Sequence, residues 1–381
     1  MYRKTYMEID TERLKKNIKK IKTVYKDYKY YFGVVKNNAY GHGIECIKYM
    51  KEAGINYFAV SSLEEALEIR KIDLETPVLV LEPITIEAAI EASKHNITIT
   101  IDDKKYYDEL KAKKIKLKYH IKIDTGMNRF GTKCKEDITD MYNDANKYLY
   151  LEGIYTHLTT GNINSDYYYK HISEFMKLTE DINLNKIDIV HLDRSLTMEQ
   201  HDKLPFANGV RLGIIMYGFA NRGFIPSKIN KLLAKFRGKT LKNIKPKLQL
   251  EQVASFKSTV IEIKNVKKGE VVGYAGMHIA SEDETIAIVP YGFADYLYNN
   301  LTYVSIKNCK YKTIAINMDV TIILVDEKVK VGDTVEIFGD NINLRTKALD
   351  TNQNVYKVLS SVSNRVPRVY KEKDKSVEIK Y

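Results

Sequence analysis

The sequence predicts an α/β fold in which an N-terminal (β/α)8 barrel is followed by a C-terminal, mainly β domain. Eight apolar segments alternate with helical segments over about the first 220 residues, which is the pattern that such a barrel requires. Beyond residue 250 the pattern changes to short alternating runs separated by turns, which indicates β-strands. A length of 381 residues with 44% hydrophobic residues suits two domains, each with its own core. We expect the barrel to span residues 1–245 and the β domain residues 246–381.

The barrel strands are predicted where apolar residues run together or alternate with polar ones. They span residues 30–35, 56–60, 78–81, 97–101, 118–123, 153–157, 187–192 and 210–217. Amphipathic helices are expected between them, and a lysine-rich helix is expected over residues 8–25 before the first strand. Eight repeats favour a closed barrel, because a doubly wound sheet usually has fewer. In the β domain, strands are predicted over residues 260–263, 285–288, 304–306, 313–316, 321–325 and 335–337.

The composition excludes several classes of protein. No apolar run approaches the roughly 20 residues of a membrane-spanning helix, and the N-terminus carries charged residues where a signal peptide has an apolar core. Cys46, Cys134 and Cys309 are scattered and odd in number, which favours reduced thiols over a disulfide framework and gives no metal site. We therefore expect a cytoplasmic protein with no metal and no membrane partner.

The net charge of +12 raises the question of a nucleic-acid partner, and its location bears on the answer. Between residues 221 and 250 there are nine basic residues and no acidic one. Ile229, Leu232, Leu233 and Phe236 recur there at helical spacing, with lysines on the other face. This pattern predicts an amphipathic helix docked on its neighbours with a solvated basic face. A polyanion site stays as the alternative, although the sequence lacks the aromatic and glycine patterns of RNA-binding modules.

Polar side chains of catalytic type stand at the ends of the predicted barrel strands. In barrels of this kind the active site lies at the C-terminal ends of the strands. The residues in question are Lys36 after the first strand, Lys122, Asp124 and Arg129 around the end of the fifth, His157 after the sixth, Ser195 after the seventh and Arg211 in the eighth. We expect them to converge on one rim of the barrel.

Lys36 is the residue around which the other predictions are arranged. An apolar strand leads into it, and a Gly-His-Gly turn follows. A lysine at the exit of a buried strand loses part of its hydration, which favours the neutral, nucleophilic amine. Such an amine could hold an aldehyde cofactor as a Schiff base. A single strand-end lysine without further context is more often a solvated terminus.

Seven ordered motifs carry a resemblance to a known family. They occupy residues 35–43 (Val-Lys-Asn-Asn-Ala-Tyr-Gly-His-Gly), 122–129, 155–157, 211–218, 273–275, 317–319 and 365–368 (Arg-Val-Pro-Arg). Over essentially its whole length the chain resembles the alanine racemases, which use pyridoxal phosphate and combine an N-terminal barrel with a C-terminal β domain. The resemblance implies an isomerase that supplies D-alanine for peptidoglycan precursors.

The resemblance also implies two bases. Lys36 would bind the cofactor and act on one face of the substrate Cα, and Tyr274 would act on the opposite face. In the family this tyrosine comes from the partner subunit, which implies a head-to-tail homodimer with composite active sites. A phenol ordinarily ionises near pH 10, so positive neighbours would have to favour its ionised form. Without its motif, Tyr274 would be one core tyrosine among 29.

The remaining roles implied by the resemblance concern the cofactor and the substrate. Arg211 would contact the pyridine nitrogen, and His157 would orient Arg211. Lys122 matches a position that is often a carbamylated lysine, which could orient Arg129. Arg129 would hold the phenolic oxygen of the cofactor and contact the substrate. The phosphate would be bound by Tyr40, Ser195 and the N–H groups of Gly213 and Ile214, and the substrate carboxylate by the N–H of Met318.

Four positions depart from the family pattern and leave the substrate open. Arg194 replaces the usual asparagine before Ser195, and Asn317 replaces a common cysteine. Phe293 replaces a tyrosine at the substrate entrance, and Asn364, beside the cofactor, replaces a tyrosine of alanine-specific relatives. We expect a racemase of alanine, with serine or both amino acids as the alternative. A non-catalytic pyridoxal-phosphate-binding protein and a decarboxylase on a similar barrel are alternatives of other classes.

Overall fold

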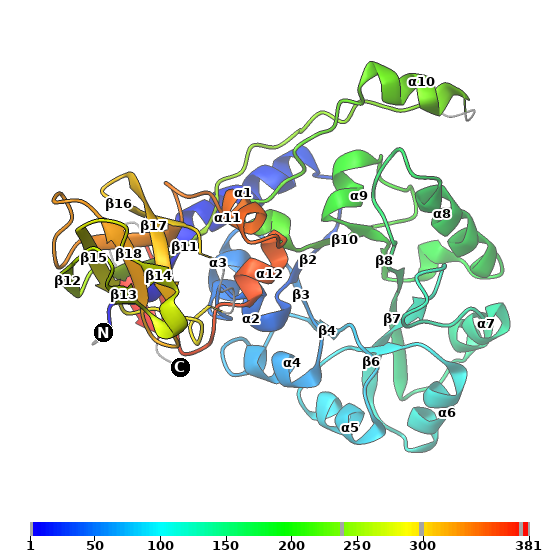
Figure 1. The fold of residues 1–381 in the computed structure, drawn as a ribbon. Helices are drawn as coiled ribbons and strands as arrows, with labels where there is room; N and C mark the ends of the chain where they lie inside the picture. Colours follow the sequence, from blue (N-terminus) through cyan, green and yellow to red (C-terminus); the bar gives the residue numbers. More distant parts are fainter. Residues whose placement is uncertain (1–2, 237–239, 297–300, 373–375, 380–381) are drawn as a thin grey trace. The chain divides into compact units, whose positions relative to one another are not determined.

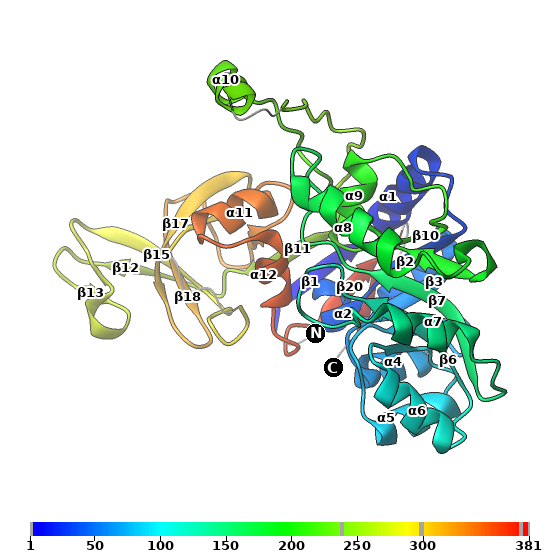
Figure 2. The same cartoon turned by 90° about the vertical axis from the view of Figure 1, so that its right-hand side faces the viewer.

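The chain separates into two compact units, which are described one at a time (Figures 1 and 2). The structure is a computed structural model that describes residues 3–236, 240–296 and 301–372 and the backbone of residues 376–379. One unit contains residues 15–37 and 47–250, and the other contains residues 1–14, 38–46 and 251–381. The division expected after residue 245 separates the chain into two continuous domains. The compact units differ from it, because residues 1–14 and 38–46 group with the C-terminal residues.

The first unit is built on parallel strands that form a barrel. The strands are β2 (Tyr30–Val34), β3 (Tyr57–Val60), β4 (Val78–Val80), β5 (Ile99–Ile101), β6 (Leu117–Ile123), β7 (Leu149–Thr156), β8 (Ile189–His191), β9 (Asp193–Arg194) and β10 (Gly209–Leu212). One run of neighbours is β4-β3-β2-β10-β9 and the other is β5-β6-β7-β8. A bridge between Leu79 and Thr98 joins β4 to β5, and β9 follows β8 after a single residue, so the ring closes. This arrangement confirms the predicted (β/α)8 barrel.

The helices of this unit lie outside the strands, as Figure 1 shows. They are α3 (Cys46–Glu52), α4 (Leu63–Arg70), α5 (Ile86–Lys94), α6 (Lys104–Ala112), α7 (Lys135–Asn143), α8 (Asp166–Leu178) and α9 (Ser195–Gln200), with α1 (Thr11–Val24) before the first barrel strand. Side-chain caps explain several of the helix starts, because Ser62, Thr85 and Asp103 each accept a backbone N–H of the first turn. The apolar faces meet the barrel with fully buried residues such as Ile18 and Ile69.

The helix predicted from residue 8 is wrong in its first turn. Residues Tyr6–Asp10 form strand β1, and α1 begins only at Thr11. Met7 and Ile9 are fully buried while their neighbours are not, which is the two-residue period of a strand. The strand pairs with β11 and β20 of the second unit, and a local helical pattern cannot reveal that pairing.

The second unit contains a ten-stranded sheet in the order β12-β15-β18-β17-β16-β19-β11-β1-β20-β21. Besides β1, its strands are β11 (Ala254–Thr259), β12 (Glu262–Val266), β15 (Glu284–Val289), β16 (Tyr303–Ile306), β17 (Cys309–Ile316), β18 (Thr321–Val325), β19 (Thr334–Phe338), β20 (Arg368–Lys371) and β21 (Ser376–Ile379). A separate hairpin is made by β13 (Val271–Val272) and β14 (His278–Ile279). The mainly β prediction is confirmed. The strand predicted over residues 260–263 is misplaced, because residues 260–261 form the connection between β11 and β12 and only residues 262–263 belong to β12.

Two helices of this unit, α11 (Leu344–Asp350) and α12 (Val355–Ser360), were not predicted.

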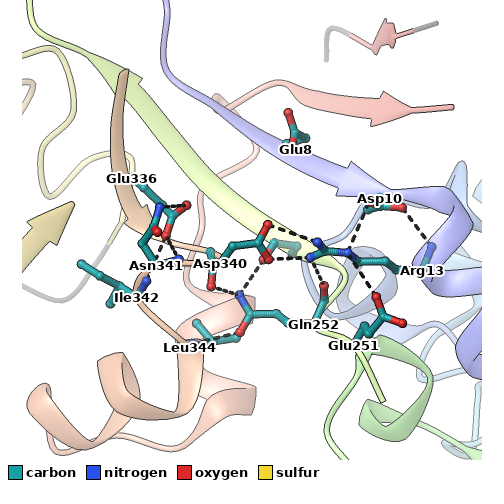
Figure 3. Close-up of polar contacts among 12 residues, drawn as sticks. Glu8, Asp10, Arg13, Glu251, Gln252, Glu336, Asp340, Asn341, Ile342 and Leu344 are labelled. Atoms are coloured by element: carbon teal, nitrogen blue, oxygen red, sulfur yellow. Dashed lines mark hydrogen bonds and ion pairs between the residues drawn. The ribbon is translucent and has the colours of Figure 1, made fainter. Parts of the chain in front are cut away.

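A polar network at the start of α1 holds the N-terminal strand in place (Figure 3). Arg13 donates two hydrogen bonds to the carboxylate of Asp340, at 2.6 and 3.1 Å, and a third to the carbonyl of Gln252 at 3.2 Å. Arg13 therefore ties the start of α1, directly after β1, to the segment before β11 and to the segment after β19.

The basic stretch after the barrel forms helix α10 (Lys228–Phe236), and the expectation that it docks on its neighbours is wrong. None of its residues is buried. Ile229 and Phe236 are 70% and 81% exposed, although they belong to the apolar face. Figures 1 and 2 both show α10 standing away from the rest of its own unit. Two of the nine basic residues, Arg237 and Lys239, lie outside the described residues. No described helix is long and apolar enough to cross a membrane.

Candidate active site

The barrel places the predicted site residues at the C-terminal ends of its strands. Lys36 follows β2, Lys122 is the penultimate residue of β6, and His157 follows β7 directly. Ser195 follows β9 and Arg211 lies within β10. Since all strands of this barrel are parallel, these ends share one rim.

Lys36 opens a turn with an uncommon backbone. It is the first residue of segment α2 (Lys36–Tyr40), and residues Asn37 to Tyr40 have φ angles between 51° and 54°. These are left-handed values, which asparagine tolerates but alanine and tyrosine rarely adopt. Four such residues in a row persist only when the surroundings impose the conformation, and strain of this kind clusters at functional sites. Sequence reasoning predicted an ordinary glycine turn here.

Arg368 is one residue that imposes this conformation. It is fully buried, and its Nε donates to the carbonyl of Gly41 at 2.9 Å. Its other nitrogens donate to three carbonyls of residues 362–366. Gly41 has a φ of +79°, and a Cβ there would lie 2.3 Å from the carbonyl oxygen of Leu359. In the sequence, Arg368 stands out only as part of the Arg-Val-Pro-Arg motif, and that pattern does not indicate this buried structural role.

Glu65 of α4 fixes the same turn from the barrel side. Its Oε1 accepts the N–H of Asn37 at 2.5 Å, and its Oε2 accepts the N–H of Ser61 at 2.8 Å. One carboxylate therefore ties the loop after β2 to the loop after β3. This contact positions the residue next to Lys36, and no sequence pattern singled it out.

Arg211 is buried and held by acceptors on several sides. Its Nη1 lies 2.7 Å from Nδ1 of His191 and donates to the carbonyl of the same residue at 2.7 Å. Its Nη2 donates to the carbonyls of Thr156 and Leu192 at 2.8 and 3.1 Å. Burial lowers the pKa of Arg211 to about 10, so the guanidinium stays charged at neutral pH.

The side chain that contacts Arg211 is thus His191 and not His157. No hydrogen bond joins His157 to Arg211 among the described residues, and the two are related through charge. Burial, together with the charges of Arg211, Arg194 and Arg129, lowers the pKa of His157 to about 2. His157 is therefore a neutral imidazole among cationic groups. The predicted orienting role of His157 stays a prediction.

A hydrogen-bonded chain continues from His191 into the barrel interior. Nε2 of His191 lies 2.9 Å from Nδ1 of His120, and Nε2 of His120 lies 3.3 Å from Oε2 of Glu152. Tyr57 and Lys118 also donate to the carboxylate of Glu152, at 2.6 and 2.8 Å. Burial raises the pKa of Glu152, but these hydrogen bonds outweigh it and bring the pKa down to about 2. The chain ends on an anion.

Lys122 lies in a positively charged environment. Burial, with the charges of Arg129 and Arg211, lowers its pKa to about 8. Its Nζ lies above the rings of Phe130 and Tyr155, at 5.1 and 5.3 Å from their centres. A large fraction of Lys122 is therefore the neutral amine at mildly alkaline pH. The side chain is buried, with 4% of its surface exposed.

A group of hydrogen-bond donors occupies the ends of β9 and β10. The hydroxyl of Ser195 accepts the N–H of Gly213 at 3.1 Å. Ile214 opens the 3-10 turn η2 (Ile214–Tyr217), and the first N–H groups of such a turn have no partner within it. These groups and the serine hydroxyl form an arrangement typical of phosphate binding.

The second unit carries the other predicted site residues. Tyr274 is 76% exposed in a short turn between Gly273, with a φ of +80°, and Ala275, with a φ of +52°. The N–H of Phe293 donates to the carbonyl of Asn317 at 3.1 Å. The N–H of Ala294 donates to the carbonyl of Met318 at the same distance, so the segments of Phe293 and Met318 are adjacent.

Asn364 lies beside the turn that follows Lys36. Its Oδ1 accepts a hydrogen bond from Nδ2 of Asn38 at 3.4 Å. Tyr40, on the same turn, has its ring 5.9 Å from that of Tyr356. Both contacts lie within the second unit, which also contains residues 38–46.

The loops that carry Met318 and Asn364 share an ion-pair network that was missed in the sequence. Asp295 is fully buried and accepts two hydrogen bonds from Arg3, at 2.6 and 2.5 Å, and one from Arg365 at 2.7 Å. Arg365 also donates to Asp319 at 2.6 Å. The R-V-P-R motif thus contributes both of its arginines to positioning.

Comparison with known proteins agrees with this geometry. The family model for the alanine racemase N-terminal domain matches residues 9–221, and that for the C-terminal domain matches residues 253–370. The chain belongs to the alanine racemase family. This is a family of isomerases that generally depend on pyridoxal phosphate.

Two curated relatives in this family cover nearly the whole chain. The alanine racemase of Borreliella burgdorferi (strain ZS7) is 31% identical over 350 residues, which is 88% of this chain and 89% of the relative. Alanine racemase 1 of Bacillus subtilis is 30% identical, with 100% of this chain and 96% of the relative covered. The names of the relatives do not favour the serine alternative.

Solved structures of the family show the same fold. The alanine racemase of Bacillus anthracis with bound L-Ala-P has a TM-score of 0.86 and 28% identity, covering 100% of this chain and 98% of that one. A histidine racemase from Leuconostoc mesenteroides subsp. sake has a TM-score of 0.83 and 26% identity, covering 97% and 99%. The fold therefore accompanies more than one substrate.

Proposed function

We propose that the chain interconverts L- and D-alanine as a cytoplasmic, pyridoxal-phosphate-dependent racemase. The observation that carries the proposal is the environment of Arg211. Four acceptors engage its terminal nitrogens, while Nε has no hydrogen-bond partner within the described part of the chain. A donor left over at the barrel rim, and not among the buried atoms of the described residues, suits an acceptor nitrogen of a bound ring.

The residues at the rim fit the cofactor. Lys36 would hold it covalently, and Arg211 would donate to its pyridine nitrogen. The phosphate would lie against the hydroxyls of Ser195 and Tyr40 and the N–H groups of Gly213 and Ile214. Bound pyridoxal phosphate acts as an electron sink and so acidifies the hydrogen on the substrate Cα. The charged guanidinium of Arg211 would oppose protonation of the ring nitrogen, which limits side reactions of the carbanion.

Proton exchange at Cα needs one base on each face. The amine of Lys36 would remove or return the proton on one face, and the phenol of Tyr274 would do so on the other. The exposure of Tyr274 supports a position from which it reaches the site of a partner subunit. A head-to-tail homodimer would then have two composite sites.

The remaining groups would position substrate and cofactor. Arg129 would hold the phenolic oxygen of the cofactor, and a carbamate on Lys122 would give Arg129 an anionic partner. The N–H of Met318 would bind the substrate carboxylate. Phe293 would line the substrate entrance, and Asn364 would lie beside the cofactor.

The visible absorbance of the purified protein tests the proposal. A yellow protein that bleaches with borohydride and then carries a pyridoxyl group on Lys36 is the expected result. D-Alanine formed from L-alanine, detected with a D-amino-acid oxidase, tests the reaction, and Tyr274→Phe should abolish it while the colour stays. A protein that stays colourless after addition of pyridoxal phosphate would overturn the proposal.

A further inference from the structure

The stretch after the barrel has a structure of its own that the racemase function does not explain. The two family matches end at residue 221 and begin again at residue 253, so the intervening residues belong to neither. Residues 222–250 contain all nine basic residues of the stretch and no acidic one. We call residues 224–244 the basic arm.

The base of the basic arm is fixed to the barrel unit. Phe224 and Ile244 exchange two backbone hydrogen bonds of 2.8 Å, which close the arm into a loop. Asn164 also donates to the carbonyl of Lys242 at 3.1 Å and accepts its N–H at 2.6 Å. Ile244 is buried. The arm is therefore a projection with a defined base, and helix α10 lies at its tip.

The tip exposes a contiguous apolar face. Ile229, Leu232, Leu233 and Phe236 are 70%, 55%, 52% and 81% exposed. Their spacing of three and four residues places them on one side of α10. Lys228, Lys231 and Lys235 lie along the adjoining side. The tip therefore combines large apolar side chains with basic ones.

This combination is the one that lies in the headgroup region of an anionic membrane. We propose that the basic arm binds the protein peripherally to bilayer surfaces that are rich in anionic phospholipid. The apolar face would enter the boundary between headgroups and acyl chains, and the lysines would contact lipid phosphates. Nine helical residues span about 13 Å, far less than the roughly 30 Å of a bilayer core, so the arm lies on the surface.

Charge favours this partner over two others. A second copy of the chain also carries a net charge of +12, and its own arm offers no acidic residue to pair with the lysines. A nucleic acid would bind the basic groups through its phosphates, but this would leave the four apolar side chains exposed to water. An anionic bilayer accommodates both features.

A single-tryptophan reporter tests the proposal directly. The chain contains no tryptophan, so the tryptophan emission of Phe236→Trp, excited where tyrosine does not absorb, reports on the tip alone. In the full-length holoenzyme, its emission should shift to the blue on addition of vesicles with equal parts phosphatidylglycerol and phosphatidylcholine. Vesicles of phosphatidylcholine alone should give no shift.

Co-sedimentation with the same vesicles separates the two contributions. Removing the apolar face in Ile229→Ser/Phe236→Ser, or reversing the charge in Lys231→Glu/Lys235→Glu, should each weaken binding at least about tenfold. The matched control is Lys113→Glu/Lys116→Glu, which makes the same charge change at exposed positions elsewhere and should bind nearly as wild type. High salt should weaken wild-type binding. Racemase activity in solution should be unchanged in all these variants, which separates the arm from the proposed function.

Three results would overturn the proposal. One is an absence of binding to anionic vesicles. Another is an emission that is already blue-shifted without vesicles, together with a change of oligomeric state in Ile229→Ser/Phe236→Ser by light scattering, because a second copy would then cover the face. The third is binding that survives loss of the apolar face, together with a gel shift of single-stranded RNA that disappears in the charge variant.

Discussion

Nη1 of Arg211 lies 2.7 Å from Nδ1 of His191, and this contact determines the protonation of a buried chain. A guanidinium only donates, so Nδ1 must be the acceptor and the proton of the neutral imidazole must be on Nε2. That proton is donated to Nδ1 of His120, whose own proton is then on Nε2 and is donated to Glu152. Every donor thus points from the cation to the anion.

We expect His191→Leu to lower kcat/KM for alanine by about 10- to 100-fold. The substitution removes the one side-chain acceptor that Arg211 has among the described residues, and a hydrogen bond to a charged group contributes about 1.5–3 kcal/mol. Steady-state kinetics and the absorbance of the bound cofactor measure the effect. His95→Leu is the matched control, because His95 is exposed directly after α5 and, within the described residues, its ring bonds only to Glu91. Equal kinetics in both variants would contradict the role of His191.

Glu152→Gln should change how stability depends on pH. The pKa of Glu152 is about 2 in the folded protein and near 4.5 in an unfolded chain, so its contribution is complete above pH 4.5. It is lost as the pH falls towards 2, and it amounts to about 3 kcal/mol. Between pH 6 and pH 3, the midpoint of thermal unfolding should therefore fall more steeply with decreasing pH in wild type than in the variant. Parallel curves would mean that the carboxylate contributes no such coupling.

Bicarbonate should stabilise the wild-type protein at pH 8. The lowered pKa of Lys122 means that the fold disfavours its protonated form. The protonated amine therefore reduces the stability of the folded protein at neutral pH, and this cost decreases as the pH rises past about 8. A carbamate would replace a cation repelled by Arg129 and Arg211 with an anion attracted to them. A rise in Tm with bicarbonate in wild type but not in Lys122→Met is the expected result. Isotope-labelled bicarbonate and NMR should detect the carbamate carbon.

The barrel could be predicted from the sequence because its signals are local. Eight strands appear as eight short apolar runs, and strand ends place Lys36, Lys122 and Arg211 on one rim without any knowledge of their contacts. Partners that lie far apart in the chain were not predicted. His120 had a usable signal, since it stands two residues before Lys122 and so faces the same side of β6.

The errors have a different origin. Strand β1 was predicted as the start of a helix because its partners, β11 and β20, lie more than 240 residues away. Helix α10 was predicted to be docked because an amphipathic pattern usually marks a contact within the chain. The left-handed turn after Lys36 could not be predicted at all. Its conformation is imposed by Arg368 and Glu65, and a local sequence pattern contains neither.

Arg13→Met should destabilise the attachment of the N-terminal strand. The paired hydrogen bonds to Asp340 are of the bidentate kind that gives the strongest exposed ion pairs, but Asp340 is largely solvent-accessible, so we expect a loss of about 1 kcal/mol. The hydrogen bond from Arg13 lowers the pKa of Asp340, so the stabilisation is present at neutral pH and is lost as the pH falls below about 4. Denaturant unfolding at pH 7 and pH 3 measures this. A variant equally destabilised at both values would show that packing, not charge, is lost.

Gly292→Ala should impair catalysis through the loop that carries Met318. A Cβ at residue 292 would lie 2.3 Å from the carbonyl oxygen of Asn317 and 2.4 Å from that of Met318, so the two segments would have to separate. If the N–H of Met318 binds the substrate carboxylate, KM should rise and kcat should fall, since a displacement of about 1 Å costs up to 100-fold in rate. Gly332→Ala is the control for backbone strain without a clash, because nothing lies within 4 Å of a Cβ there while the φ of +96° disfavours alanine. Normal kinetics in a folded Gly292→Ala protein would remove Met318 from the substrate site.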